Sequence, residues 1–148
     1  GRLFRLQYEP ASRKTPAAPT AIAGSPIATL SAADRQLSEA LDDFIARKGY
    51  HQNALTIGVM ARQLDCQEHR LRRLINQTRG YRNFNSLLND LRVADATERL
   101  SDPACDHLPI LSIALDLGYD SVGPFNRAFK AKTDQTPGEY RRSVQNRR

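Results

Sequence analysis

Residues 118–130 read GYDSVGPFNRAFK, and an apolar stretch with helical spacing comes directly before them at 110–117. Gly118 ends that stretch, and glycine readily adopts the left-handed backbone that closes a helix. Ala114 is small enough to lie where two helices cross. Phe125 and Phe129 fall one turn apart on the following segment, where they would fill the angle between the helices. The pattern predicts two short helices that meet steeply across a tight turn.

A weaker copy of this helix-turn-helix pattern occupies residues 55–76. Ala61 is its small residue, Asp65 stands at the turn, and Leu71 and Ile75 would fill the angle between the helices. Asp tolerates the left-handed conformation better than most residues, so this turn does not need glycine. One such pattern arises by chance in small helical bundles, but two in one chain make DNA binding the first hypothesis.

Helical periodicity and helix-end signals continue through the chain from residue 31. Ser31 and Asp34 resemble a capping box with Asp in place of Glu, Thr56 is a helix-starting residue type, and Asp102 before Pro103 stops the longest helix. The expected helices cover residues 31–49, 56–64, 67–77, 83–100, 109–117, 121–132 and 137–140. The sequence predicts an all-α fold of about seven helices, with two helix-turn-helix subdomains joined by the long linker helix 83–100.

The first 30 residues differ in composition from the rest. Residues 9–30 are rich in Pro, Ala, Ser and Thr and hold four of the eight prolines, so they cannot bury enough apolar surface to order themselves. Residues 2–8 alternate polar and apolar, as a short strand or the tail of an upstream part would. Because the chain begins at Gly1 rather than Met, we expect a fragment. The expected division is 1–30 as a disordered linker from a missing upstream domain, 31–82 and 101–142 as the subdomains, 83–100 as the linker helix and 143–148 as a basic tail.

The positive charge gathers on the two helix-turn-helix segments. The chain has a formal net charge of +6 and a pI of about 9.7, which favours a polyanionic partner. Residues 62–82 carry six arginines against Asp65 and Glu68, and residues 121–148 carry seven basic residues against Asp134 and Glu139. This distribution is typical of a protein that approaches nucleic acid through both motifs.

The segment from Gly118 to Arg141 resembles the second helix-turn-helix of AraC/XylS-type transcription regulators, and the resemblance extends over residues 31–142. It implies a C-terminal DNA-binding domain in which a monomer reads two adjacent major-groove segments of double-stranded promoter DNA. The expected helix 83–100 would be about 27 Å long, close to the ~34 Å between successive major grooves. The chain departs from the family at Asp65 and Asp134, which replace glycines, and at residues 80–84, where a Gly-x-x-Phe form is one residue longer.

The resemblance also implies partners other than DNA. Regulators of this type carry a separate sensor domain upstream, and many activate transcription by contact with RNA polymerase. The variant at residues 123–130 is similar to members whose upstream part is embedded in a membrane, which would tether the full-length protein. The two cysteines, Cys66 and Cys105, make no disulfide framework and fit a reducing cytoplasm. We expect the fragment itself to be cytoplasmic and monomeric.

The residues expected to contact DNA lie opposite the apolar faces of the two reading helices. On helix 67–77 they are Gln67, Glu68, His69, Arg72, Arg73 and Asn76. On helix 121–132 they are Ser121, Val122, Gly123, Asn126, Arg127 and Lys130. Arg72 and Arg73 are the best candidates for base or phosphate contact, because Arg can grip guanine O6 and N7 with two hydrogen bonds. The resemblance implies the same role for Arg127.

Some of these residues have alternative roles. Glu68 either accepts a hydrogen bond from cytosine N4 or repels non-cognate DNA. Val122 and Gly123 offer few hydrogen bonds, so the second unit either reads fewer bases or uses backbone contacts and thymine methyl groups. Ser121 is expected as a helix N-cap that also bonds a phosphate. The remaining arginines are expected as solvated surface charges: Arg62, Arg79, Arg82, Arg147 and Arg148.

No other chemistry has enough residues to support it. Cys66 and His69 could share a turn as metal ligands, but structural zinc needs four ligands, and Cys105 and His107 would join only through a distant fold-back. Cys66 is better explained as a small buried turn residue, and His51 has no evident partner. We expect no metal, no cofactor and no enzymatic activity.

Two other classes of function compete with the promoter reader. The first is a helical protein-interaction module whose arginines bind an acidic protein. The second is a nucleic-acid-binding protein without sequence preference. Both predict little gain in affinity for specific DNA over random DNA.

Overall fold

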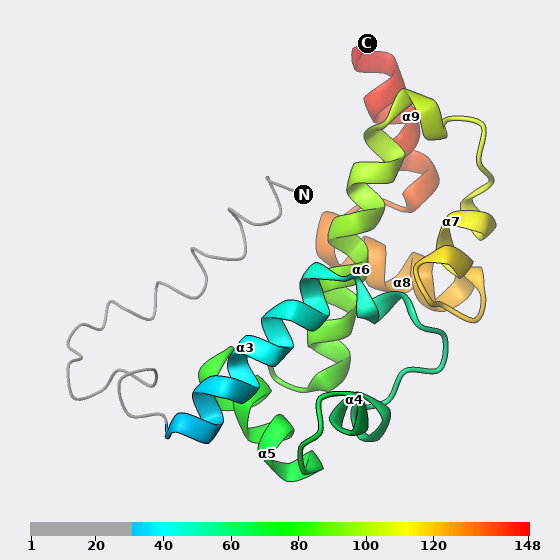
Figure 1. Cartoon of the computed structure of the whole chain (residues 1–148). Coiled ribbons are helices and arrows are strands. Elements are labelled where there is room, and N and C mark those ends of the chain that lie inside the picture. Colours follow the sequence, from blue (N-terminus) through cyan, green and yellow to red (C-terminus); the bar gives the residue numbers. More distant parts are fainter. Residues whose placement is uncertain (1–30) are drawn as a thin grey trace, which may run out of the picture. The chain divides into compact units, whose positions relative to one another are not determined.

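The computed structural model describes residues 31–148, which form two compact units (Figure 1). Unit 1 consists of residues 31–49 and Thr56–Leu87, and unit 2 of Tyr50–Leu55 and Leu88–Arg148. The predicted linker 1–30 lies outside the described residues. The short segment Tyr50–Leu55 therefore belongs to unit 2, although the chain on both sides of it belongs to unit 1.

Every regular element in residues 31–148 is helical, so the all-α prediction is confirmed. The α-helices are α3 (Ala32–Ala46), α4 (Ile57–Gln63), α5 (Glu68–Arg73), α6 (Phe84–Ser101), α7 (Ile110–Asp116), α8 (Val122–Thr133) and α9 (Pro137–Arg147). Two 3-10 turns, Gly49–His51 and Pro103–Cys105, and one π-helical turn, Leu74–Thr78, complete the described elements. None of these helices is long and apolar enough to cross a membrane.

The predicted N-caps of the first two helices are confirmed. Ser31 Oγ accepts a hydrogen bond from the backbone N–H of Asp34 at 3.1 Å, and Thr56 Oγ1 accepts one from Val59 at 3.1 Å. These bonds satisfy N–H groups that the first helical turn leaves without partners. The carboxylate of Asp34 pairs with the Arg70 guanidinium at 2.8 Å, so Asp34 also ties α3 to α5.

The first helix is shorter than predicted. It ends at Ala46, and Lys48 follows with φ of 60°. Gly49 therefore does not end the helix. It is required by close packing instead, because a methyl group at this position would lie 2.6 Å from the Phe44 ring. The aromatic ring covers the backbone where the chain leaves α3.

The last helix is longer than predicted, and most of the expected basic tail is helical. Thr136 and Glu139 form a capping box: Thr136 N–H donates to Glu139 Oε1 at 2.9 Å, and Glu139 N–H donates to Thr136 Oγ1 at 3.2 Å. The Thr136 N–H bond lowers the pKa of the Glu139 carboxyl. Pro137 fits the first helical position, where an N–H is not needed. Val144, which lies inside the expected tail 143–148, is buried.

Each unit has its own buried apolar residues. In unit 1 they are Leu37, Leu41, Phe44, Met60, Ala61, Leu71, Leu74, Ile75 and Leu87. In unit 2 one cluster comprises Val93, Ala96, Leu100, Ile113, Ala114, Leu117, Tyr119, Phe125 and Phe129. The rings of Phe125 and Phe129 meet edge to face with centroids 5.8 Å apart. The residues predicted to fill the angle between the helices of each motif are thus core residues: Leu71, Ile75, Phe125 and Phe129.

Within residues 31–148, four residues other than glycine have a left-handed backbone. They are Lys48, Ala54, Asp65 and Asp134, with φ between 55° and 65°. Asp65 and Asp134 are the two positions where the family resemblance calls for glycine. The structure therefore keeps the glycine-like turn geometry at both positions with an aspartate.

Two ion pairs lower carboxyl pKa values, one in each unit. In unit 1 the hydrogen bond from Arg70 lowers the pKa of Asp34. In unit 2 Arg148 lies 2.6 Å from Asp106 and lowers the pKa of that carboxyl by the same mechanism. Arg148 is therefore not the free surface charge that the sequence suggested.

These lowered values predict how stability changes with pH. A carboxyl whose pKa is lower in the folded chain stabilises the fold above its unfolded value of about 4, and this contribution is lost as the pH falls below it. The melting temperature should hold between pH 7 and 5 and fall below about pH 4. Asp34→Asn, which removes one shifted group, should make the acid-side slope shallower. Thermal melts followed by circular dichroism would test this, and an unchanged slope in the variant would contradict it.

Candidate nucleic-acid interface

The first helix-turn-helix comprises α4 and α5 of unit 1, and a Schellman motif closes α4. Asp65 has the left-handed backbone with φ of 55°. Its N–H donates to Arg62 O at 3.2 Å, and the Cys66 N–H donates to Ala61 O at 3.0 Å. These two bonds satisfy carbonyls that would otherwise lack partners at the end of α4. Ala61 is 3% exposed, as expected for a contact between two helices.

The second helix-turn-helix, α7 and α8 of unit 2, closes in the same way. Gly118 has φ of 101°, its N–H donates to Leu115 O at 3.0 Å, and the Tyr119 N–H donates to Ala114 O at 3.0 Å. Ala114 is fully buried. The two motifs therefore share one turn geometry, with Asp65 and Gly118 at equivalent positions, as the sequence predicted.

The expected reading face of the first motif is exposed. All six residues predicted on it are exposed: Gln67, Glu68, His69, Arg72, Arg73 and Asn76. Arg72 Nη2 donates to Glu68 Oε2 at 2.8 Å, one helical turn away. This face can donate and accept hydrogen bonds in the way that base edges require.

The second half of this reading segment is not a regular α-helix. The sequence predicts one helix over 67–77, but α5 ends at Arg73 and the π-helical turn Leu74–Thr78 follows. Asn76 therefore lies on a wider turn than predicted. The segment ends at Arg79 and Gly80, which has φ of 76°. The buried Leu74 and Ile75 keep their inward positions through this change.

The reading face of the second motif is smaller. Ser121, Arg127 and Lys130 are exposed, whereas Val122, Gly123 and Asn126 are half-buried. Asn126 is thus more buried than predicted. Its Oδ1 is buried without a hydrogen-bond partner among residues 31–148.

The N-terminus of α8 has an unused cap. Ser121 occupies the N-cap position in extended backbone, yet its side chain makes no capping hydrogen bond. A cap side chain bonds the N–H of the second or third helical residue, and the third is Pro124, which has none. The Arg127 guanidinium lies close by, because a methyl group at Gly123 would be 3.6 Å from its Nη1.

Two basic residues in the first motif have structural roles. Arg70 is paired with Asp34, as described above. Arg79 donates to Ser38 O at 3.1 Å and to Asp42 Oδ1 at 2.7 Å, and its side chain is only 11% exposed. Arg79 therefore anchors the end of the π-helical turn to α3 and is not the solvated charge that the sequence predicted.

A buried arginine holds the turn of the second motif. Arg92 on α6 is 5% exposed, and it donates from Nε to Tyr50 O at 2.8 Å and from Nη2 to Gln52 O at 2.9 Å. Its guanidinium lies over the Tyr119 ring, 5.0 Å from the centroid. Burial lowers the pKa of Arg92. A methyl group at Gly118 would lie 2.6 Å from Arg92 Nη2, so only glycine fits there.

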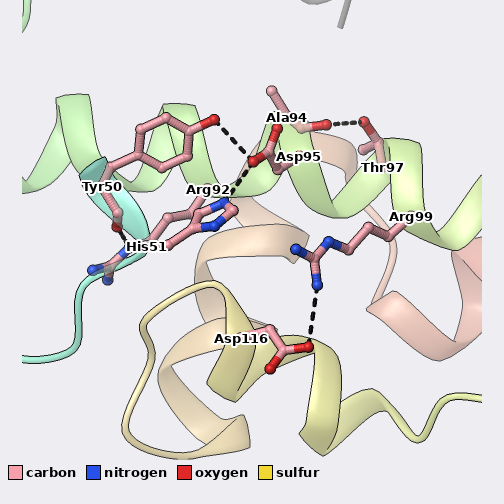
Figure 2. A network of polar contacts seen from close by, with 8 residues as sticks. All are labelled: Tyr50, His51, Arg92, Ala94, Asp95, Thr97, Arg99 and Asp116. Atoms are coloured by element: carbon pink, nitrogen blue, oxygen red, sulfur yellow. Dashed lines mark hydrogen bonds and ion pairs between the residues drawn. The ribbon is translucent and has the colours of Figure 1, made fainter. Parts of the chain in front are cut away.

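The segment that supplies those carbonyls is held by a second set of polar contacts (Figure 2). Tyr50 and His51 both point at Asp95 of α6: the Tyr50 hydroxyl donates to Oδ2 at 2.8 Å, and His51 Nε2 lies 2.7 Å from the same oxygen. Burial, with Asp95 close by, raises the pKa of Tyr50, which keeps the hydroxyl protonated as a donor. Asn53 donates to Gly118 O at 3.4 Å. His51 thus has a partner that the sequence did not reveal.

The cysteines and histidines form no metal-ligand cluster within residues 31–148. No group of three or more His, Cys, Asp or Glu side chains comes together there. Cys66 and Cys105 are both free and half-buried, and burial raises the pKa of the Cys66 thiol.

Comparisons with known proteins agree with the two motifs. The family described as "Helix-turn-helix domain" matches residues 60–143, more than half of the chain. The regulatory protein SoxS of Escherichia coli is 52% identical over 33 residues, which are 22% of this chain and 31% of SoxS; the SoxS of Salmonella typhimurium matches equally. The chain thus spans under a third of these relatives.

Two solved structures share the fold. The C-terminal domain of AraT, a response regulator from Geobacillus stearothermophilus, is 32% identical with a TM-score of 0.64, over 78% of this chain and 88% of that domain. A transcriptional regulator of the AraC-type DNA-binding class from Chromobacterium violaceum has a TM-score of 0.61 at 21% identity, over 76% of this chain and 94% of that one.

The close packing at Gly118 predicts that a methyl group there destabilises the fold more than one at Gly80. Gly118→Ala should lower the free energy of unfolding by roughly 2–5 kcal/mol, because strain in the left-handed backbone adds to overpacking against Arg92 Nη2 and His51 O, which lie 2.6 and 2.7 Å from an added methyl group. Gly80→Ala is the matched control: Gly80 also has positive φ, but nothing lies within 4 Å of an added methyl group. It should cost about 1 kcal/mol. Urea denaturation measures both losses, and equal losses would show that the packing of Arg92 and His51 O against Gly118 does not constrain the turn.

Proposed function

The chain belongs to the AraC/XylS-type helix-turn-helix family of DNA-binding transcription regulators, and we propose from this premise that it reads two adjacent major-groove segments of promoter DNA, one with α5 and one with α8. The observation that carries the proposal is the repeated turn geometry. Each unit places a second helix after the same Schellman motif, with polar and basic residues exposed on that helix. A helix presented in this way fits the major groove of B-DNA.

In the first unit, the reading segment has the chemistry of base recognition. Arg72 and Arg73 present guanidinium groups that match guanine O6 and N7, and His69 and Asn76 add further hydrogen-bonding groups. Arg70 and Arg79 are engaged within the unit, so they stabilise the reader rather than contact DNA. We therefore assign most of the sequence preference to α5 and the π-helical turn after it.

In the second unit, the chemistry favours the DNA backbone. Val122 and Gly123 carry no hydrogen-bonding side chains, while Ser121 has an uncommitted hydroxyl and Arg127 is exposed. Hydroxyl, guanidinium and free helix N–H groups all suit phosphate oxygens, which fix register and orientation without reading sequence. The second unit then contributes affinity and a smaller share of specificity.

The family resemblance implies further parts around this domain. Among the similar proteins, AraT is a response regulator whose solved part is its C-terminal domain, and SoxS is a regulatory protein. From the resemblance we infer that this chain is the DNA-binding part of a cytoplasmic activator that receives its signal through another domain and contacts RNA polymerase at the promoter. The described units bind DNA as a monomer in this proposal.

Alanine substitution on each reading helix tests the two-segment proposal. Arg72→Ala and Arg127→Ala should each weaken binding to a selected duplex by about 1–3 kcal/mol, since each removes charge-assisted contacts to bases or phosphates. Duplexes selected from a random library by the wild-type chain would be footprinted and then titrated with each variant. Protection of two segments about one helical turn apart is expected, with Arg72→Ala relaxing base preference in one of them.

Arg62→Ala provides a control of equal charge, because Arg62 is exposed on α4 and is part of neither reading helix. It should change affinity much less than either variant. Recovery of no preferred sequence would favour a protein without sequence preference. Failure to bind any duplex, with retained binding to an acidic polypeptide, would favour a protein-interaction module.

A further inference from the structure

Glu68 lies on the reading face of α5 with both carboxylate oxygens in defined surroundings. Oε2 accepts the hydrogen bond from Arg72 Nη2 at 2.8 Å. Oε1 faces α4: a methyl group at Gly58 would lie 3.4 Å from it. The carboxylate is therefore bracketed between the backbone of α4 and the guanidinium of Arg72, all within unit 1.

This ion pair contributes little to the stability of the fold. The side chains of Glu68 and Arg72 are 49% and 51% exposed, and exposed pairs one helical turn apart stabilise a helix only slightly. The pair restricts the conformational freedom of the Arg72 side chain. An arginine with several rotatable bonds loses entropy when it binds, and a neighbour that holds it in place removes part of that loss beforehand.

We propose that Glu68 is a positioning residue that holds the Arg72 guanidinium for a two-hydrogen-bond contact with one guanine in the major groove. The inference rests on the proposed function, in which α5 enters that groove. Arg72 has five N–H donors and gives one to Glu68, so enough remain for guanine O6 and N7. Glu68 has a second effect, because its negative charge repels phosphates that approach in any other register.

The same geometry favours action through Arg72 over direct base reading by Glu68. Oε2 accepts from Arg72 and Oε1 is turned to Gly58. A hydrogen bond from cytosine N4 would therefore have to share Oε2 with Arg72 or turn Oε1 away from α4. The carboxylate therefore acts through Arg72, and its removal should have no effect once Arg72 is gone.

The test uses duplexes selected from a random library by the wild-type chain. The Arg72→Ala preference profile identifies the guanine pair that Arg72 reads, and a second duplex replaces that G·C pair with A·T. Dissociation constants for both duplexes give a discrimination ratio. Glu68→Gln should lower this ratio by about 2- to 10-fold, the range expected for the freedom of one long side chain. It should at the same time tighten binding to a random duplex, because a negative charge is removed.

Two further variants complete the design. In an Arg72→Ala background, Glu68→Gln should leave the ratio unchanged. Glu39→Gln removes an equal charge from the exposed side of α3 in the same unit and should leave the ratio at its wild-type value. Opposite changes in discrimination and in random-duplex affinity would not arise from a loss of folding, which weakens both.

The outcomes separate the inference from the function it rests on. If the wild-type chain selects no sequence, both are overturned. If it selects one but Arg72→Ala loses no guanine preference, or Glu68→Gln keeps the full ratio, only the positioning role is overturned. If Glu68→Gln lowers the ratio equally in the Arg72→Ala background, Glu68 reads a base by itself.

Discussion

The geometry of unit 2 depends on how the buried Arg92 guanidinium is satisfied. A buried cation without partners is strongly unfavourable, and here the carbonyls of Tyr50 and Gln52 compensate it. If the segment that carries those carbonyls left unit 2, the buried guanidinium would lose both hydrogen bonds and its burial would become unfavourable. The same guanidinium fills the space beside Gly118, so it also fixes the turn that aims α8. The direction of the second reading helix is therefore set by backbone groups remote from it in sequence.

In both motifs the geometry of the turn is independent of the side chains that are exposed on the following helix. The turns close with the same pair of backbone hydrogen bonds, with Asp65 in one and Gly118 in the other, because these bonds come from the backbone and need a left-handed residue rather than a particular side chain. The exposed side chains are then free to differ. Unit 1 presents several hydrogen-bonding groups, and unit 2 presents Val122 and Gly123 where a base reader would carry polar side chains. One turn geometry is thus compatible with two different sets of exposed side chains.

The sequence predicts structural features that depend on residues close along the chain, and it misses contacts between residues that are far apart along the chain. Helix starts such as Thr56 follow from caps three residues away. The capping box of Thr136 and Glu139 is equally local, but it marks only where the last helix begins and not its end at Arg147. The partners of Arg79, Arg148 and His51 lie 37 to 47 positions away in the sequence, and no periodicity predicts them. For the same reason two expected surface charges proved to be ion pairs. Which residues touch DNA stays a prediction.

The residues with left-handed backbone carry a consequence for the evolution of this chain. Lys48 and Ala54 have side chains that favour other conformations, and each such residue costs roughly 1 kcal/mol relative to glycine. A small domain has only a few kcal/mol of net stability. The free energy of unfolding could therefore still be raised by substitution at these turns. Asparagine or glycine there would offset later destabilising changes on the reading helices, so new operator preferences could be acquired without loss of the fold.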